Sequence, residues 1–237
     1  MSIPLPGRAA NPPAKRSLMV WEQLVQRGIR DQRVLEAMGR LPREQFVPSA
    51  MIPLAYEDKA LAIGHEQTIS QPYMVALMLE ALELDPSNRV LEVGAGSGYA
   101  TALLSQLAGE VVALEYVPEL AQKATERLRR FDVQNVRVVV ADGSRGYPQR
   151  APYDRILVSA AAPEVPPSLV DQLDEGGILV IPVGDRLQQT LLKISRRRGE
   201  TRTENLCACV FVPLLGEEGW SEAECELERE RGGEKPR

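Results

Sequence analysis

The sequence is poor in cysteine and histidine, and each shortage excludes a class of site. The 237 residues include three cysteines and one histidine. Because three is an odd number and Cys207, Cys209 and Cys225 all lie late in the chain, they indicate neither a disulfide framework nor a zinc site. We expect a protein of the reducing cytoplasm that holds no metal.

Long apolar runs and an excess of basic residues are also missing. No run reaches the roughly 18 apolar residues that suggest a membrane-spanning helix, and the first 16 residues contain four prolines. The net charge is −5; residues 217–237 hold eight Glu against four Lys and Arg, which gives −4 to that segment alone. The body is therefore near neutral, and neither a membrane nor nucleic acid is expected as a partner.

Composition and the positions of proline and charged residues divide the chain into four parts. Residues 1–16 are rich in proline and predict a disordered arm. Residues 17–85 predict an N-terminal helical region on the substrate side, which includes an irregular stretch with three prolines. Residues 86–215 predict the catalytic core, and residues 216–237 predict a charged, disordered tail without an assigned function.

Short apolar strands and helices alternate through the core. β-branched runs at 89–93, 110–115, 136–141, 154–160 and 177–184 are typical of buried parallel strands. Helical patterns lie between the first and second runs, between the second and third, and before the fifth. Two further runs, 189–197 and 205–214, flank a turn and predict an antiparallel hairpin. The fold class is thus a doubly wound, mostly parallel α/β sheet of the Rossmann-like kind, with that hairpin closing it.

A glycine-rich turn follows the first core strand. In "VLEVGAGSGY", Gly94, Gly96 and Gly98 stand between the strand and a helix, where the backbone can approach a ligand closely. The dinucleotide fingerprint requires glycine at position 99, but this chain has Tyr99. The loop resembles the first motif of class I methyltransferases, which use S-adenosylmethionine.

Two acids end the next two strands. Glu115 ends the second strand, where a carboxylate can accept the hydroxyls of a ribose, and Asp142-Gly143 ends the third. In the superfamily that the glycine loop resembles, an acid at the latter place reaches the adenine amino group. Taken singly, each is also compatible with a solvated strand-end acid.

The acceptor side of the sequence favours a carboxylate. The strand sequence "RILV" (155–158) runs into "SAAAPEVP", and the Asn/Asp-Pro-Pro-aromatic clamp that many amine methyltransferases carry is missing there. A carboxylate is ionised at neutral pH, with a free pKa of about 4, and is already a nucleophile. Such a site has chiefly to orient the carboxylate and exclude water.

Several blocks together are similar to the protein-L-isoaspartate O-methyltransferase family, in order from about residue 18 to 215. Among them are "TISQP", "VLEVGAGSGYATALLSQLAG", "PPSLVDQLDEGGILVIPVG" and "VFVPL". The resemblance implies methyl transfer from S-adenosylmethionine to the α-carboxylate of L-isoaspartyl residues in damaged proteins, by a monomer. The methyl ester then forms a succinimide, whose hydrolysis partly restores aspartate.

The resemblance also implies residue roles. Ser70 would be the catalytic residue. We expect it to orient the carboxylate and not to act as a covalent nucleophile, because His65 is the single histidine and no catalytic triad can be recognised in the sequence. The expected cofactor-binding residues are Thr68, Ile69, Gly94, Gly96, Ser97, Gly98, Glu115, Asp142 and Gly143. Alternatively, Ser70 caps the helix that follows it. Glu66 departs from the family, which often has glycine there.

Two other functions are compatible with the sequence. One is another carboxyl or hydroxyl O-methyltransferase on the same scaffold, and the other is a catalytically silent, cofactor-binding adaptor. The presence of Ser70 and Asp142 argues against the silent protein.

Overall fold

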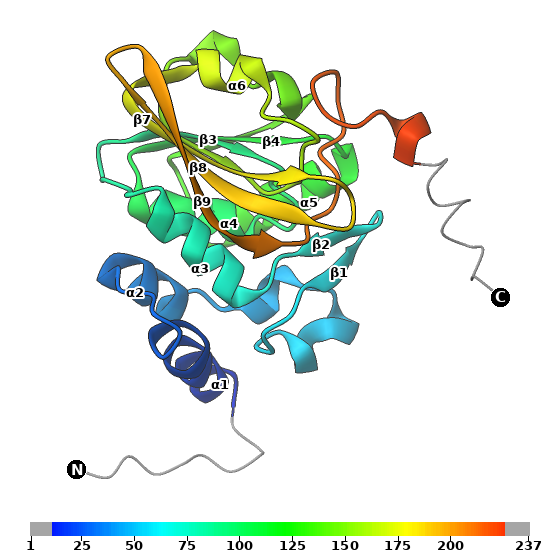
Figure 1. The fold of residues 1–237 in the computed structure, drawn as a ribbon. Coiled ribbons are helices and arrows are strands. Elements are labelled where there is room, and N and C mark those ends of the chain that lie inside the picture. Colours follow the sequence, from blue (N-terminus) through cyan, green and yellow to red (C-terminus); the bar gives the residue numbers. More distant parts are fainter. Residues whose placement is uncertain (1–10, 226–237) are drawn as a thin grey trace, which may run out of the picture.

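A twisted seven-stranded sheet forms the centre of the computed structural model, which describes residues 11–225 (Figure 1). The strand order is β5-β4-β3-β6-β7-β8-β9. Their bounds are β3 Arg89–Val93, β4 Glu110–Glu115, β5 Val136–Val140, β6 Tyr153–Val158, β7 Leu173–Gly184, β8 Gln189–Arg197 and β9 Glu200–Cys209.

The strands from β3 to β7 are parallel, and the last two strands reverse direction. β3 pairs in parallel with both β4 and β6, whereas β7 with β8 and β8 with β9 are antiparallel. The chain therefore leaves β3 toward one side and later returns to its other side. In open α/β sheets, ligands bind at the carboxyl ends of the strands at such a point of reversal. The predicted fold class is confirmed.

Side chains of alternate strand positions form two hydrophobic layers, one on each face of the sheet. Val90 and Val111 belong to the layer that includes buried residues of α3 (Pro72–Ala81), α4 (Tyr99–Leu107) and α5 (Pro118–Arg130). Leu91 and Val112 belong to the layer on the other face, which includes Leu169 of the short helix α6 (Pro167–Asp171). The buried strands thus carry apolar side chains on both faces, as their β-branched runs predicted.

The N-terminal helices stack outside α3 and α4 (Figure 1). They are α1 (Pro12–Leu18), a π-helical segment (Met19–Val25) and α2 (Gln32–Arg40), whose predicted cap Asp31 accepts hydrogen bonds from the amides of Arg33 and Val34. The predicted disordered arm is wrong for residues 11–16, because Asn11 caps α1 and proline occupies its first turn. Residues 1–10 of that arm lie outside the described residues.

An irregular connection, as expected, leads from α2 to α3. It contains two 3-10 turns, Arg43–Phe46 and Ser49–Leu54, and a small hairpin of β1 (Leu61–Gly64) and β2 (Gln67–Ile69). His65 and Glu66 form the turn of this hairpin with φ values of 52° and 57°. A two-residue hairpin turn favours such left-handed backbone, which glycine adopts more readily than glutamate does.

The C-terminal hairpin differs from its predicted bounds. β9 begins at Glu200 and not at 205, because Arg198-Gly199 alone makes the turn with positive φ values. It ends at Cys209, and residues 210–214, which were predicted as strand, leave the sheet. The side-chain oxygen of buried Gln189 accepts a hydrogen bond from the Phe211 amide there (2.8 Å), and Pro213 has no amide hydrogen to donate.

The predicted disordered tail is wrong for its first ten residues. Residues 216–225 fold back along the core, where Gly216 and Glu218 contact the end of β5 and the start of α6. Backbone hydrogen bonds within the segment, such as Gly216 N–H to Trp220 O at 3.1 Å, explain why its charge does not leave it unfolded. Residues 226–237 of the tail lie outside the described residues. Over the described part of the chain, no helix combines the length and apolarity needed to cross a membrane.

A carboxylic acid lies in the middle of the sheet. Glu92 of β3 is fully buried, and within residues 11–225 neither oxygen of its carboxyl group has a hydrogen-bond partner. Burial away from water raises the pKa of Glu92 to about 8, the Glu115 carboxylate adds to the rise, and the Thr101 hydroxyl opposes it. Glu92 is therefore mainly protonated in the folded protein at pH 7.

This buried acid should make the stability depend on pH. The unfolded chain loses the Glu92 proton near pH 4.5 and the folded chain only near pH 8. The stabilisation present below pH 4.5 is thus lost as the pH rises to 8, at up to about 1.4 kcal/mol per pH unit. We predict that Glu92→Gln flattens the pH dependence of the unfolding free energy between pH 5 and 8, measured by urea denaturation without cofactor. Glu204→Gln, at an exposed position of β9, is the matched control and should keep the wild-type slope; equal slopes in all three proteins would contradict the assignment.

Candidate functional site

A cavity lies at the carboxyl edge of the sheet, between the strand ends and the β1–β2 hairpin. Segments at the ends of four parallel strands line one side, and residues 67–70 and 212–215 line another. Residues of α3 and α4, among them Val75 and Tyr99, complete the lining. The strand-end residues include 94–97 after β3, 115–117 at β4, Ala141 and Gly143 after β5, and 159–160 after β6. The structure thus brings the predicted glycine loop and the Thr68–Ser70 segment to one site.

The glycine loop is bonded to the neighbouring strand β4. Gly94, Gly96 and Gly98 all have positive φ, and the amides of Gly94 and Ala95 donate to the Leu114 carbonyl at 2.9 and 3.0 Å. Arg127 of α5 donates to the carbonyl of Ser97 at 3.1 Å. These contacts fix the loop against the sheet without the help of a ligand.

Glu115 connects the loop to the end of β4. Its side chain is almost completely buried; one oxygen accepts the Gly96 amide at 2.7 Å and the other the Val117 amide at 3.0 Å. An ionised carboxylate offers about four acceptor positions. The two bonds to the backbone therefore hold Glu115 in the cavity wall and leave acceptor capacity for ligand hydroxyls.

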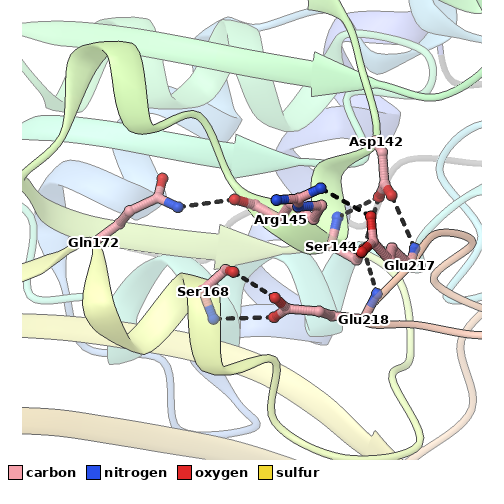
Figure 2. Close-up of polar contacts among 7 residues, drawn as sticks. All are labelled: Asp142, Ser144, Arg145, Ser168, Gln172, Glu217 and Glu218. Atoms are coloured by element: carbon pink, nitrogen blue, oxygen red, sulfur yellow. Dashed lines mark hydrogen bonds and ion pairs between the residues drawn. The ribbon is translucent and has the colours of Figure 1, made fainter.

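Asp142 and Gly143 follow β5 but play different parts. Gly143 lines the cavity, and a Cβ atom on it would lie 2.5 Å from Val93 Cγ1, so only glycine fits. The Asp142 carboxylate accepts the amide and hydroxyl of Ser144 with one oxygen (2.9 and 2.7 Å) and the Glu217 amide with the other (2.8 Å), as Figure 2 shows. Asp142 does not line the cavity wall itself, and its contact with adenine stays a prediction.

Thr68, Ile69 and Ser70 form the opposite wall. Ile69 is buried, Thr68 is exposed and Ser70 is half-buried, and all three line the cavity. The Ser70 hydroxyl makes no hydrogen bond to any part of the chain that the structure describes. The alternative role as a helix cap is not seen, because the N-cap of α3 is Gln71, whose side chain makes no capping bond.

A buried arginine holds this wall in place. Arg43 is fully buried and donates from Nε to the Ala55 carbonyl and from Nη2 to the Ser70 carbonyl, both at 2.8 Å. Its Cζ lies 5.0 Å from the centre of the Tyr99 ring. Burial lowers the pKa of Arg43, and the Tyr99 side chain opposes this fall. Arg43 was not predicted from the sequence; an arginine directly after Pro42, at the end of a helical pattern, was the available signal.

Four further cavity residues were not predicted from the sequence, and the single histidine lies outside the cavity. Val212, Pro213, Leu214 and Leu215 line the cavity although the sequence placed the first three in a strand. His65 lies at the exposed hairpin turn and lines a neighbouring groove instead, together with Glu66 and Arg186. No group of three His, Cys, Asp or Glu residues suited to a metal ion occurs within the described ranges.

Comparisons with known proteins agree with this geometry. The family model described as protein-L-isoaspartate(D-aspartate) O-methyltransferase matches residues 14–219. Proteins named protein-L-isoaspartate O-methyltransferase are 52% identical in Methanoculleus marisnigri, over 87% of this chain and 94% of that one, and 55% identical in a Roseiflexus species, over 84% and 91%.

Solved structures extend the likeness to three dimensions. A protein-L-isoaspartate O-methyltransferase superposes with a TM-score of 0.78 at 32% identity, over 92% of this chain and 69% of that one. A second, from Plasmodium falciparum and in complex with S-adenosyl-L-homocysteine, gives a TM-score of 0.74 at 29% identity, over 84% and 98%. With a family model matched over most of its length and relatives above half identity, this chain belongs to the protein-L-isoaspartate(D-aspartate) O-methyltransferase family.

Proposed function

We propose that the protein is a repair enzyme that transfers a methyl group from S-adenosylmethionine to the α-carboxylate of L-isoaspartyl residues. The observation that carries this proposal is the cavity that joins the glycine loop to Thr68–Ser70, in a chain whose match to the family spans residues 14–219. The glycine loop accounts for the cofactor, and the Thr68–Ser70 wall accounts for the acceptor.

The residues around the cavity suit the chemistry of the proposed cofactor. Gly143 keeps the wall free of side chains, Glu115 offers acceptor positions to ribose hydroxyls, and Asp142 lies beside the cavity within the same strand-end cluster. Thr68, Ile69, Gly94, Gly96 and Ser97, which all line the cavity, would complete the contacts. Gly98, also predicted from the sequence, does not line it and instead lets the loop pack closely on Ala124 of α5. When bound, the cofactor would supply an electrophilic methyl group on a sulfonium ion.

The chain's own residues have a modest chemical task. The isoaspartyl carboxylate is ionised at neutral pH, so no residue has to remove a proton from it. We propose that the Ser70 hydroxyl, which the rest of the described chain leaves available, donates a hydrogen bond that orients this carboxylate. Arg43 would keep Ser70 in place through its main-chain carbonyl.

The ester product would react further without the enzyme. The amide nitrogen of the following residue attacks the ester carbonyl and methanol leaves, which gives a succinimide. Water opens the succinimide to a mixture of aspartate and isoaspartate, so repeated cycles restore aspartate.

We further propose that the damaged polypeptide occupies the groove beside the cavity. Thr68, Tyr116 and Leu215 line both the cavity and the groove, so an extended chain in the groove could present one carboxylate to the cavity. The enzyme would act as a cytoplasmic monomer on proteins and peptides, without nucleic acid, membrane or metal.

A pair of peptides tests the reaction. We expect labelled methyl transfer from S-adenosylmethionine to a peptide with isoaspartate at one position, and at least about a hundredfold less to the same peptide with aspartate, because the orientation of the carboxylate differs by one methylene. Transfer to both peptides would favour a broader carboxyl methyltransferase. Transfer to neither, with cofactor bound, would favour a silent binding protein.

The role of Ser70 makes a second prediction. Ser70→Ala should lower kcat/KM for the isoaspartyl peptide at least about tenfold, because it removes one hydrogen bond to a charged acceptor, while KM for S-adenosylmethionine changes little. The measurement is steady-state methyl transfer with each substrate varied in turn.

Ser105→Ala is the matched control for Ser70→Ala. The Ser105 hydroxyl donates to the Ala102 carbonyl in the same helix, α4. This variant should keep the wild-type kcat/KM. Wild-type turnover in Ser70→Ala would rule out the proposed orienting role.

A further inference from the structure

Residues 214–220 form a strap at the mouth of the cofactor cavity, and we call them the acidic strap. At one end, Leu214 and Leu215 line the cavity. The Leu214 amide donates to the Ala161 carbonyl at 2.8 Å, and the Trp220 amide donates to the Leu214 carbonyl at 2.7 Å, so the strap folds back on itself. The indole of Trp220 also donates to the Ala161 carbonyl, at 3.1 Å.

The middle of the strap lies directly on the end of β5. The Glu217 amide donates to Asp142, and the Glu218 amide donates to the Ser144 hydroxyl at 3.0 Å (Figure 2). Gly216 has a φ of 146°, and a Cβ atom there would lie 2.0 Å from Asp142 Oδ1. This contact leaves no room for a side chain at position 216. The strap and the Asp142 carboxylate therefore fix each other's position.

The two glutamates of the strap are attached very differently. The Glu218 side chain is half-buried and accepts two hydrogen bonds from Ser168 at the start of α6, one from its amide at 2.9 Å and one from its hydroxyl. The Glu217 side chain pairs with Arg145 at 2.8 Å, but both are more than half exposed. Exposed ion pairs contribute little, whereas charge-assisted hydrogen bonds at a half-buried site contribute more.

We propose that Glu218 is a positioning residue for cofactor binding. Its bonds to Ser168 fasten the strap, and the fastened strap holds the Leu214–Leu215 wall and fixes the Asp142 carboxylate. With one oxygen of Asp142 bonded twice and the other once, the strap leaves a single defined acceptor position for a ligand amino group. The inference rests on the proposed cofactor but not on the identity of the methyl acceptor.

Calorimetric titration with S-adenosylhomocysteine tests the role of Glu218. Glu218→Ala should raise the Kd about tenfold, because two charge-assisted hydrogen bonds that fix the wall are lost. Glu218→Gln, which can still accept from the Ser168 amide, should restore most of the affinity. Glu217→Ala is the matched control and should leave the Kd unchanged, because its amide still donates to Asp142.

Two further readouts separate positioning from a general loss of structure. In the cofactor-free protein, Glu218→Ala should speed hydrogen exchange at the amides of residues 214–220 and leave the strands of the sheet unchanged. If Glu218→Ala does not fold, Ser168→Ala supplies a milder version of the same loss and should raise the Kd about threefold. At saturating cofactor, the kcat of each folded variant should stay within about twofold of wild type.

The outcomes are distinct from those of the peptide experiment. A Kd in Glu218→Ala within twofold of wild type, or an equal rise in Glu217→Ala, would overturn the proposal. Because the titration contains no isoaspartyl peptide, it reports on the strap even if the proposed methyl acceptor is wrong.

Discussion

The register of β3 between β4 and β6 is the constraint on which the site depends. Parallel pairing aligns Val93 with Leu114 on one side and with Val158 on the other. The residues that follow these three strands consequently emerge at one level, and the glycine loop, Glu115 and Ser159 meet in one cavity. A slip of one position would turn the alternating side chains of β3 to the wrong faces and misplace the loop after it.

The second wall of the cavity has a different physical basis. Residues 67–70 belong to no large sheet, and their place is set by a short hairpin and by Arg43. A guanidinium in an apolar core is costly, and two carbonyl acceptors and the face of Tyr99 offset part of that cost here. Among the described residues, the guanidinium Nη1 has no hydrogen-bond partner. Asp58 contributes a further contact next to this wall, since its carboxylate accepts a hydrogen bond from the side-chain amide of Gln71 at 3.2 Å. The segment is thus fixed by polar contacts from distant parts of the chain.

The sequence predicted the sheet well because its information is local. Buried parallel strands read as short β-branched runs, and glycines and prolines mark where they end, so β3, β4 and β8 have the predicted bounds. The glycine loop and Glu115 follow such strands directly, and their convergence could be expected from topology alone.

The remaining features depend on contacts between segments far apart in the chain. The sequence around Arg43 does not indicate that its hydrogen-bond partners are Ala55 and Ser70, and the sequence around Glu218 does not indicate Ser168. A run of acidic residues resembles a solvated tail until the surface that it covers is known. For the same reason, the predicted start of β9 was five residues too late. A two-residue turn at Arg198-Gly199 and the Gln189 side chain decide where pairing with β8 starts and stops.

The path of the chain after β9 also sets the minimal catalytic unit. The sheet is complete at Cys209, yet the segment beyond it builds part of the cavity wall, and that wall is closed by Trp220 through the carbonyls of Leu214 and Ala161. A polypeptide trimmed to the last strand, or even to Leu215, would keep the Rossmann-like sheet but lose a side of its ligand site. Residues 221–225 also pack on the molecule, since Cys225 is buried and its carbonyl accepts a hydrogen bond from Arg186 at 3.1 Å. Truncations and C-terminal fusions of this protein therefore have their natural boundary after residue 225.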